Sequence, residues 1–308
     1  MRLRYWLLLI VAAFGWGIGG VITRAAFDQG VDPVEFSAYR SAVAVIAMLG
    51  YLLAAHRPIP TDREAWRAGM VIGTVNLAAP FLLLTFAVVY ASAGFVGLLV
   101  ANLPITTALW AHFLGDERLK GATVFGLSVS FAGMLLLLAS GDSGLDEGGN
   151  AALAIGLTLL GLAMASYGIL YAKRALASID SVRLALPQFA IGSALLIALL
   201  PFTDGLPAGV TTYGWLLIIS AGVFSTALPF LAFYRAMKHV TATQAALTGY
   251  LIPIVAIVLG ALLLDERVTP AMLAGGALIL AGVVLTDRAA SGHAAPVTTD
   301  PPGVTSPP

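Results

Sequence analysis

An internal duplication constrains the fold of this chain more than any other feature. The segment from Ile252 to Leu285 has the same design as a segment 149 residues earlier, and no gap is needed to align them. Each copy carries a proline in an apolar run, an acidic-acidic-basic corner, and two glycines in a second apolar run. The matched positions are Pro80 and Pro229, Pro104 and Pro253, Asp116-Glu117-Arg118 and Asp265-Glu266-Arg267, Gly126 and Gly275, and Gly133 and Gly282. The chain is therefore expected to fold as two related halves.

The composition places these halves in a membrane. Hydrophobic residues make up 59% of the 308 positions, charged residues make up 10%, and the mean hydropathy is +0.93. A soluble globule of this size needs more polar surface, so the expected solvent is lipid. The net charge is zero and there is no basic arm, which argues against a nucleic-acid partner. The absence of cysteine excludes disulfides, thiolate metal sites and cysteine nucleophiles.

Ten apolar runs have about the length, 17 to 25 residues, that crosses a bilayer as a helix. The predicted fold is thus an all-α integral membrane protein with ten transmembrane helices. The runs cover residues 5–26, 34–55, 68–89, 93–114, 121–140, 151–172, 182–201, 212–235, 241–263 and 270–287. The first run has the basic start of a secretory signal. We expect it to be retained, because it continues past Trp16 to Ile22 and the repeat requires a first helix.

The distribution of lysine and arginine predicts the orientation. With a cytoplasmic N-terminus, 13 of these residues fall on the cytoplasmic side, Arg24 and Arg267 fall outside, and Arg40 lies within the second helix. Both termini are therefore expected to be cytoplasmic. The predicted divisions are a first repeat at 1–140, an outer loop at 141–150, a second repeat at 151–288 and a disordered cytoplasmic tail at 289–308.

Five helices in each half give the two halves opposite orientations in the membrane, because five is an odd number. Such an inverted-topology repeat is typical of transporters in which related halves rock around a site near the middle of the bilayer. The duplication therefore predicts transport by alternating access.

Several motifs resemble the EamA family of the drug/metabolite transporter superfamily. They are Trp16-Gly17 with Arg24 in the first helix, Arg40 in the second, and the paired stretches LGDERLKGATVFGLSVSFAGMLLLL and LLDERVTPAMLAGGALILAGVVL. The resemblance covers about residues 5 to 287. It implies a bacterial inner-membrane carrier, commonly an exporter of amino acids or other small metabolites. The second half has Gln188 where the first has Arg40, so the role of this arginine is not duplicated.

Polar and aromatic residues within the spans predict a central cavity, since a polar group in hydrocarbon is costly unless it faces protein or water. The candidate lining residues are Trp16, Asn76, Asn102, Thr106, Tyr167, Phe230 and Tyr250. For any single aromatic residue, core packing or an interfacial position is an equal alternative. The matched prolines Pro80, Pro104, Pro229 and Pro253 predict kinks that act as hinges or gates, with a static bend as the alternative.

Charged residues near the outer side suggest a further role. Arg40 lies about seven residues into the second helix, and Glu35 or Asp32 could meet it or Arg24. We treat Arg40 and Glu35 as gate candidates, with a contact from Arg40 to a substrate carboxylate as the alternative. The glycines spaced seven apart are expected to pack helices five and ten closely, as a scaffold or a dimer contact.

The predicted function is a secondary transporter that exports a small organic metabolite, either an amino acid or a related amphipathic or zwitterionic solute. Alternatives are a passive pore and, with less support, a membrane-embedded transferase. No aspartate or glutamate lies near the middle of a span, which weakens an obligatory proton relay. No cofactor, metal site or catalytic residue is expected, the partners are substrate and lipid, and the protein is expected to be a monomer or a homodimer in the inner membrane.

Overall fold

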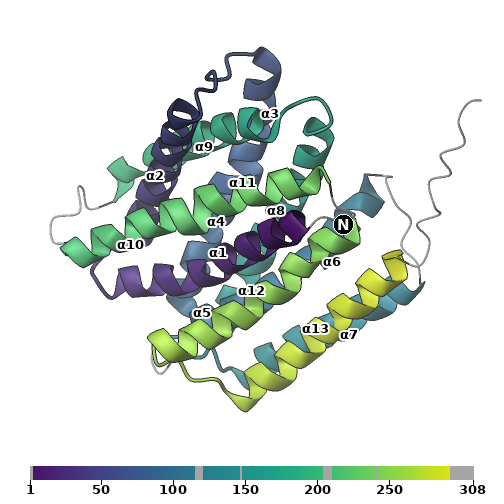
Figure 1. Ribbon diagram of the computed structural model, residues 1–308. Helices are drawn as coiled ribbons and strands as arrows, with labels where there is room; N and C mark the ends of the chain where they lie inside the picture. Colours follow the sequence, from purple (N-terminus) through teal and green to yellow (C-terminus); the bar gives the residue numbers. More distant parts are fainter. Residues whose placement is uncertain (1–2, 115–120, 146–147, 204–209, 240–241, 292–308) are drawn as a thin grey trace, which may run out of the picture.

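The computed structural model describes residues 3–114, 121–145, 148–203, 210–239 and 242–291 (Figure 1). Within these ranges all regular elements are helical. The first repeat contains α1 (Leu3–Phe27), α2 (Pro33–Ala54), α3 (Arg63–Gly73), η1 (Thr74–Ala78), α4 (Ala79–Tyr90), α5 (Ala93–Val100), α6 (Leu103–Phe113) and α7 (Gly121–Ser140). The second contains α8 (Ala151–Ala175), α9 (Ser181–Ile197), η2 (Leu200–Phe202), α10 (Thr212–Gly222), η3 (Val223–Ala227), α11 (Leu228–Met237), α12 (Ala242–Leu263) and α13 (Pro270–Ser291).

These helices form ten apolar spans, which confirms the predicted number. Eight helical segments among the described residues have the length and hydropathy to cross a membrane. Shorter apolar helices at Thr248–Leu263 and Pro270–Thr286, within α12 and α13, complete the set. The third span begins at Arg63 rather than at residue 68, because Asp62 caps the amide of Ala65 and starts α3 earlier.

Matched interruptions divide the third and eighth spans. The π-helical turns η1 and η3 occupy positions that differ by 149 residues, and each comes directly before a helix with proline as its second residue. Pro80 and Pro229 have no N–H to donate to the carbonyl four residues earlier. In both repeats, the residue after the turn donates instead to the carbonyl five residues earlier. The two prolines therefore lie at equivalent wide turns, the kind of irregularity that bends a helix.

The second pair of matched prolines does not produce equivalent breaks. In the fourth span, α5 ends at Val100 and α6 begins at Leu103, so Pro104 is the second residue of a new helix. In the ninth span, α12 runs through Pro253 as one helix. The two repeats therefore share one type of interruption and differ in the other.

Helices of one repeat pack mainly against helices of the other. The third span contacts the sixth and seventh, and the eighth contacts the first and second. At the edge of the bundle, α7 and α13 lie side by side (Figure 1). A Cβ atom on Gly133 would lie 2.6 Å from the carbonyl oxygen of Gly275, and one on Gly282 would lie 2.5 Å from that of Gly126. The four glycines therefore pack these two helices within one chain.

Candidate substrate cavity

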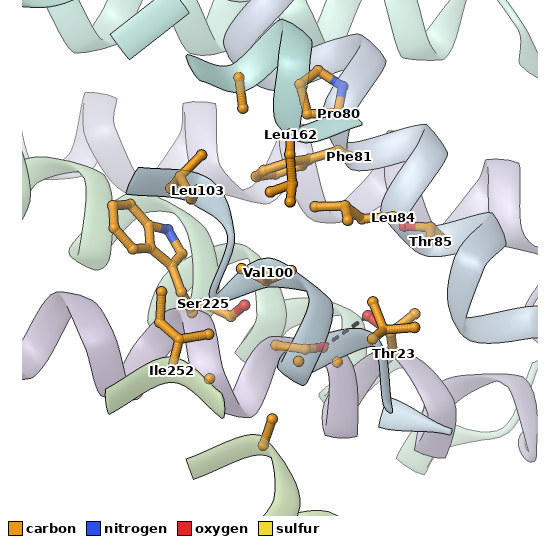
Figure 2. A pocket seen from close by; sticks show the side chains of 18 of the residues that line it. Thr23, Pro80, Phe81, Leu84, Thr85, Val100, Leu103, Leu162, Ser225 and Ile252 are labelled. Atoms are coloured by element: carbon orange, nitrogen blue, oxygen red, sulfur yellow. Dashed lines mark hydrogen bonds between the residues drawn. The ribbon is translucent and has the colours of Figure 1, made fainter. Parts of the chain in front are cut away.

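A cavity of about 160 Å³ lies between the two repeats, and helices of both form its wall. The first repeat contributes parts of α1, α2, η1, α4, α5 and α6, and the second contributes parts of α8, η3, α11 and α12. Figure 2 shows Pro80, Phe81 and Leu84 along one side of this space, with Ser225 and Ile252 across from them. An apolar cavity of roughly 150 Å³ can hold a benzene molecule, so the space suits a small organic solute.

Aromatic side chains form one part of the wall. Trp16 meets Phe230 and Phe233 edge to face, with ring centroids 5.5 Å and 5.1 Å apart. The ring centroid of Phe230 also lies 6.2 Å from that of Phe81, and this contact connects the two repeats. Such contacts fix the ring orientations, because aromatic pairs favour these geometries. The wall is therefore apolar on this side.

A buried chain of hydrogen bonds reaches the cavity wall. The side-chain amide of Asn76 donates to the Tyr234 hydroxyl at 3.2 Å, and this hydroxyl donates to Gln188 Oε1 at 2.6 Å. All three residues are buried, and Asn76 and Tyr234 line the cavity. The Gln188 amide nitrogen has no hydrogen-bond partner among the described residues. The chain joins η1, α11 and α9 across the repeat boundary.

Arg40 provides a buried cation at the cavity. It is 8% exposed, and its Nε and Nη2 donate to the Thr226 hydroxyl at 3.3 Å and 3.2 Å. Its guanidinium carbon lies 4.1 Å from the centre of the Phe81 ring and 5.5 Å from that of Phe36. Thr226 in turn donates to the carbonyl of Ala221 across the π-helical turn, which orients its oxygen toward the arginine. The unusual backbone of η3 therefore positions the partner of Arg40.

Glycines bring α1 directly against the second repeat. A Cβ atom on Gly15 would collide with Pro229 and the carbonyl of Phe224, and one on Gly19 would lie 2.5 Å from the Ser225 hydroxyl. The GxxxG spacing of the first helix thus serves close packing against η3 and α11. Substitution of either glycine would push α1 away from η3 and α11.

The structure brings together part of the set predicted to line the cavity. Trp16, Asn76 and Phe230 are in its wall, together with the gate candidates Pro80 and Arg40. Asp32 instead caps α2 by accepting from the amides of Val34 and Glu35, and Arg24 donates to the carbonyl of Val88 at 3.4 Å. The described contacts of Arg40 include no carboxylate.

Other predicted lining residues lie elsewhere. Asn102 Oδ1 accepts from Ser130 of α7 at 2.5 Å, and Thr106 shares a hydrogen bond of 2.5 Å with Ser166 of α8. Both line a second pocket between α6, α7 and α8, where Phe131 is exposed on the outer surface of the bundle.

Two aromatic candidates pack outside the cavity wall. Tyr167 packs edge to face against Trp110, with centroids 5.5 Å apart. Tyr250 is half-buried against the apolar cluster that includes Phe95 and Leu98.

The remaining gate candidates surround the cavity without lining it in the described part of the chain. Pro229 contacts Gly15 of α1, Pro104 packs near Gly249 of α12, and Pro253 lies against α5. Glu35 is buried in the first turn of α2.

Several lining residues were absent from the predicted set, and the duplication is the signal that finds them. Phe81 is 149 residues before Phe230, and Ser225 is 149 residues after Asn76. All four line the cavity. Thr85 and Tyr234 are a further matched pair in the wall. Phe230 and Asn76, both selected from the sequence, thus pointed to Phe81 and Ser225 in the other half.

The second acidic-basic corner connects the repeats at one end of the cavity. Glu266 accepts from the amides of Ala93 and Gly94, at 2.6 Å and 3.0 Å, and thereby caps the first turn of α5. Ser92 caps the same turn through Phe95. A carboxylate is favourable here because the amides and the helix dipole present positive charge. The corner at 116–118 lies outside the described residues.

Ten spans in two five-span repeats around a shared cavity define the class of the protein: a multi-pass membrane transporter. The model of the EamA-like transporter family matches residues 3–139 and 152–287. The chain belongs to this family, with one copy of the domain in each repeat.

Known relatives span nearly the whole chain. The uncharacterized inner membrane transporter YedA of Escherichia coli (strain K12) is 27% identical over 93% of both chains. The "Probable terminal-alkyne amino-acid exporter" of Streptantibioticus cattleyicolor is 25% identical over 92% of this chain and 94% of its own length. A crystal structure with 19% identity superposes with a TM-score of 0.67, covering 93% of this chain and 99% of the other, which supports the fold.

Proposed function

We propose that this protein is a secondary transporter that exports a small organic metabolite by alternating access. The observation that carries the proposal is the cavity itself, whose wall comes from both repeats and from the two matched turns that precede Pro80 and Pro229. Related halves around one site can expose it first to one side and then to the other.

The turns at Pro80 and Pro229 are the proposed hinges. Each is a wide turn next to a residue of the cavity wall, so bending there changes the wall directly. Pro104 and Pro253 are proposed as secondary gate positions, since one adjoins a break between helices and the other packs on α5. Glu35 is proposed to act at the outer end of α2.

The proposed solute is an amino acid or a related amphipathic compound. An aromatic and apolar wall with a few polar groups suits an apolar body that carries a polar head. The similarity to a probable amino-acid exporter supports export as the direction of transport and amino acids as the class of solute. Asn102, Thr106, Tyr167 and Tyr250 are retained as proposed contacts in another conformation of the carrier.

The excess of lysine and arginine on one side supports cytoplasmic termini, with repeats at 1–140 and 151–288, an outer loop between them and a cytoplasmic tail from 289. The similarity to an inner membrane transporter supports that location.

Counterflow in proteoliposomes tests the proposal. Purified protein is reconstituted with an unlabelled amino acid inside, and entry of the labelled compound is measured. A carrier gives entry that is stimulated by the compound inside the vesicle. Flux without this stimulation would instead indicate a passive pore, and formation of a new compound would indicate a transferase.

A further inference from the structure

The contacts of Arg40 include no carboxylate in the described part of the chain. Arg40 is the one charged residue among the described residues that line the cavity. Its contacts are a hydroxyl and two aromatic rings. A buried charge within a membrane span is costly, and arginines in such positions usually pair with an anion or line an aqueous cavity. A negatively charged group bound in the cavity would therefore stabilise the charge of Arg40.

The guanidinium retains donors that can bind this group. Arginine has five N–H donors in a planar arrangement. The contacts with Thr226 involve Nε and Nη2. Within the described residues no acceptor contacts Nη1, so this amino group is available to a solute. A planar guanidinium matches the two oxygens of a carboxylate better than it matches any neutral head group.

A second donor lies on the same turn. Ser225 is 1% exposed and belongs to the cavity wall, and its hydroxyl has no hydrogen-bond partner among the described residues. Ser225 precedes Thr226 directly on η3, so the partner of Arg40 and this hydroxyl are held by the same turn. A buried hydroxyl without a partner is rare, because leaving it unpaired costs free energy. An acceptor from a bound solute would satisfy it.

We propose that Arg40 and Ser225 form a carboxylate subsite of the cavity, with the apolar body of the solute against Trp16, Phe81 and Phe230. This inference rests on the proposed carrier function and names its substrate class. The class is small monocarboxylates with an apolar body, including zwitterionic amino acids. Amines and amides with the same body are excluded, because the first repel the guanidinium and the second lack the anion.

Two series of isosteric probes separate the carboxylate from the rest of the solute. The first is L-leucine, 4-methylpentanoate, L-leucinamide and 3-methylbutylamine. The second is L-phenylalanine, 3-phenylpropionate, L-phenylalaninamide and 2-phenylethylamine. Binding to purified protein is measured by thermal stabilisation and by tryptophan fluorescence. Transport is measured separately by counterflow in proteoliposomes.

Three variants accompany the wild type. Arg40→Gln removes the charge and keeps a polar side chain. Arg40→Lys keeps the charge but lacks the paired donors of the planar guanidinium, so it is expected to bind carboxylates better than Arg40→Gln and more weakly than the wild type. Arg67→Gln is the matched control, because Arg67 is exposed at the start of the third span. Size-exclusion profile and helix content identify any variant that does not fold. If Arg40→Gln does not fold, Arg40→Lys tests the subsite, because it should bind carboxylates more weakly than the wild type.

The expected result is that the wild type binds carboxylates of at least one series and does not bind the matched amide and amine. Arg40→Gln should weaken carboxylate binding by about 10- to 100-fold, and Arg67→Gln should leave it unchanged. Equal binding of the amide by the wild type, unchanged carboxylate affinity in Arg40→Gln, or no carboxylate binding at all would overturn the subsite.

Binding and counterflow separate the subsite from the carrier function. Charge-dependent binding without counterflow would support the subsite and overturn the proposed carrier. Counterflow of the amide, which keeps the ammonium group and lacks the carboxylate, at equal rates in the wild type and Arg40→Gln would support the carrier and overturn the subsite.

Discussion

Replacement of Gly133 by alanine tests whether glycine packing between α7 and α13 holds the edge of the bundle together. The added Cβ atom would lie 2.6 Å from the carbonyl oxygen of Gly275 and 3.0 Å from Ile279. Ordinary contacts begin at 3.4 Å, so the two helices must separate by about 0.8 Å. A gap of this size forfeits about a quarter to a half of the dispersion attraction between the atoms that face it.

This separation sets the expected loss of stability. Small-to-large changes in a packed core cost about 1–3 kcal/mol, and we expect Gly133→Ala to fall in this range. Gly275→Ala brings its Cβ atom to 2.7 Å from the Leu137 side chain but only to 3.0 Å from the carbonyl oxygen of Gly133, so its cost should be smaller. The two changes widen the same interface, so the double variant should lose less stability than the sum of the single variants.

Unfolding in mixed detergent and dodecyl sulfate micelles, followed by circular dichroism, measures these differences. The matched control is Gly156→Ala in α8, where an added Cβ atom meets nothing within 4 Å. Alanine is a better helix former than glycine by about 1 kcal/mol, so the control should be as stable as the wild type or more stable. If Gly133→Ala were as stable as Gly156→Ala, close packing of α7 and α13 would not be what these glycines provide.

Three further predictions concern the ends and turns of the helices. Glu266→Ala leaves two amides at the start of α5 without their acceptor, so it should lower the free energy of unfolding by about 1–2 kcal/mol in the same assay; no change would mean that water replaces the carboxylate. The hydrogen bond from Arg183 holds the pKa of Asp62 below its usual value, so the stabilisation is present at neutral pH and is lost as pH falls through this lowered pKa. Arg183→Gln should therefore be less stable than the wild type at pH 7, and its free energy of unfolding should approach that of the wild type in acid. A difference in free energy that does not depend on pH would show that the lowered pKa of Asp62 is not the cause. Pro80→Ala and Pro229→Ala should slow counterflow, and Pro229→Ala, which lies outside the lining of the cavity, should leave binding of the solute unchanged; rates equal to the wild type would contradict a hinge at these turns.

The ten spans and their division into repeats could be predicted because hydropathy and the 149-residue offset are properties of the chain itself. The matched prolines likewise indicated where the third and eighth spans are interrupted. The π-helical form of these turns was not predictable, since proline requires only that one hydrogen bond be absent. Whether the helix then breaks, as before Pro104, or continues, as through Pro253, depends on packing.

The cavity was harder to predict because helical spacing shows which residues share a face but not which neighbouring helix that face meets. Asn102 and Thr106 form a polar stripe, yet the break after Val100 directs them toward α7 and α8. The sequence allowed an ion pair between Arg40 and Glu35 or Asp32. Arg40 meets Thr226 because the second and eighth spans pack together, a contact between residues 186 positions apart.

Distances between paired spin labels in lipid nanodiscs test alternating access most directly. The chain has no cysteine, so labels can be placed at cysteine pairs without background. One pair is Arg67 and Lys238, at one end of the third and eighth spans; the other is Val89 and Leu216, the positions related to them by the 149-residue offset. We predict that a transported amino acid shifts the two distances in opposite directions, with one pair closing as the other opens. Distances that stay fixed, or that increase together, would contradict the account.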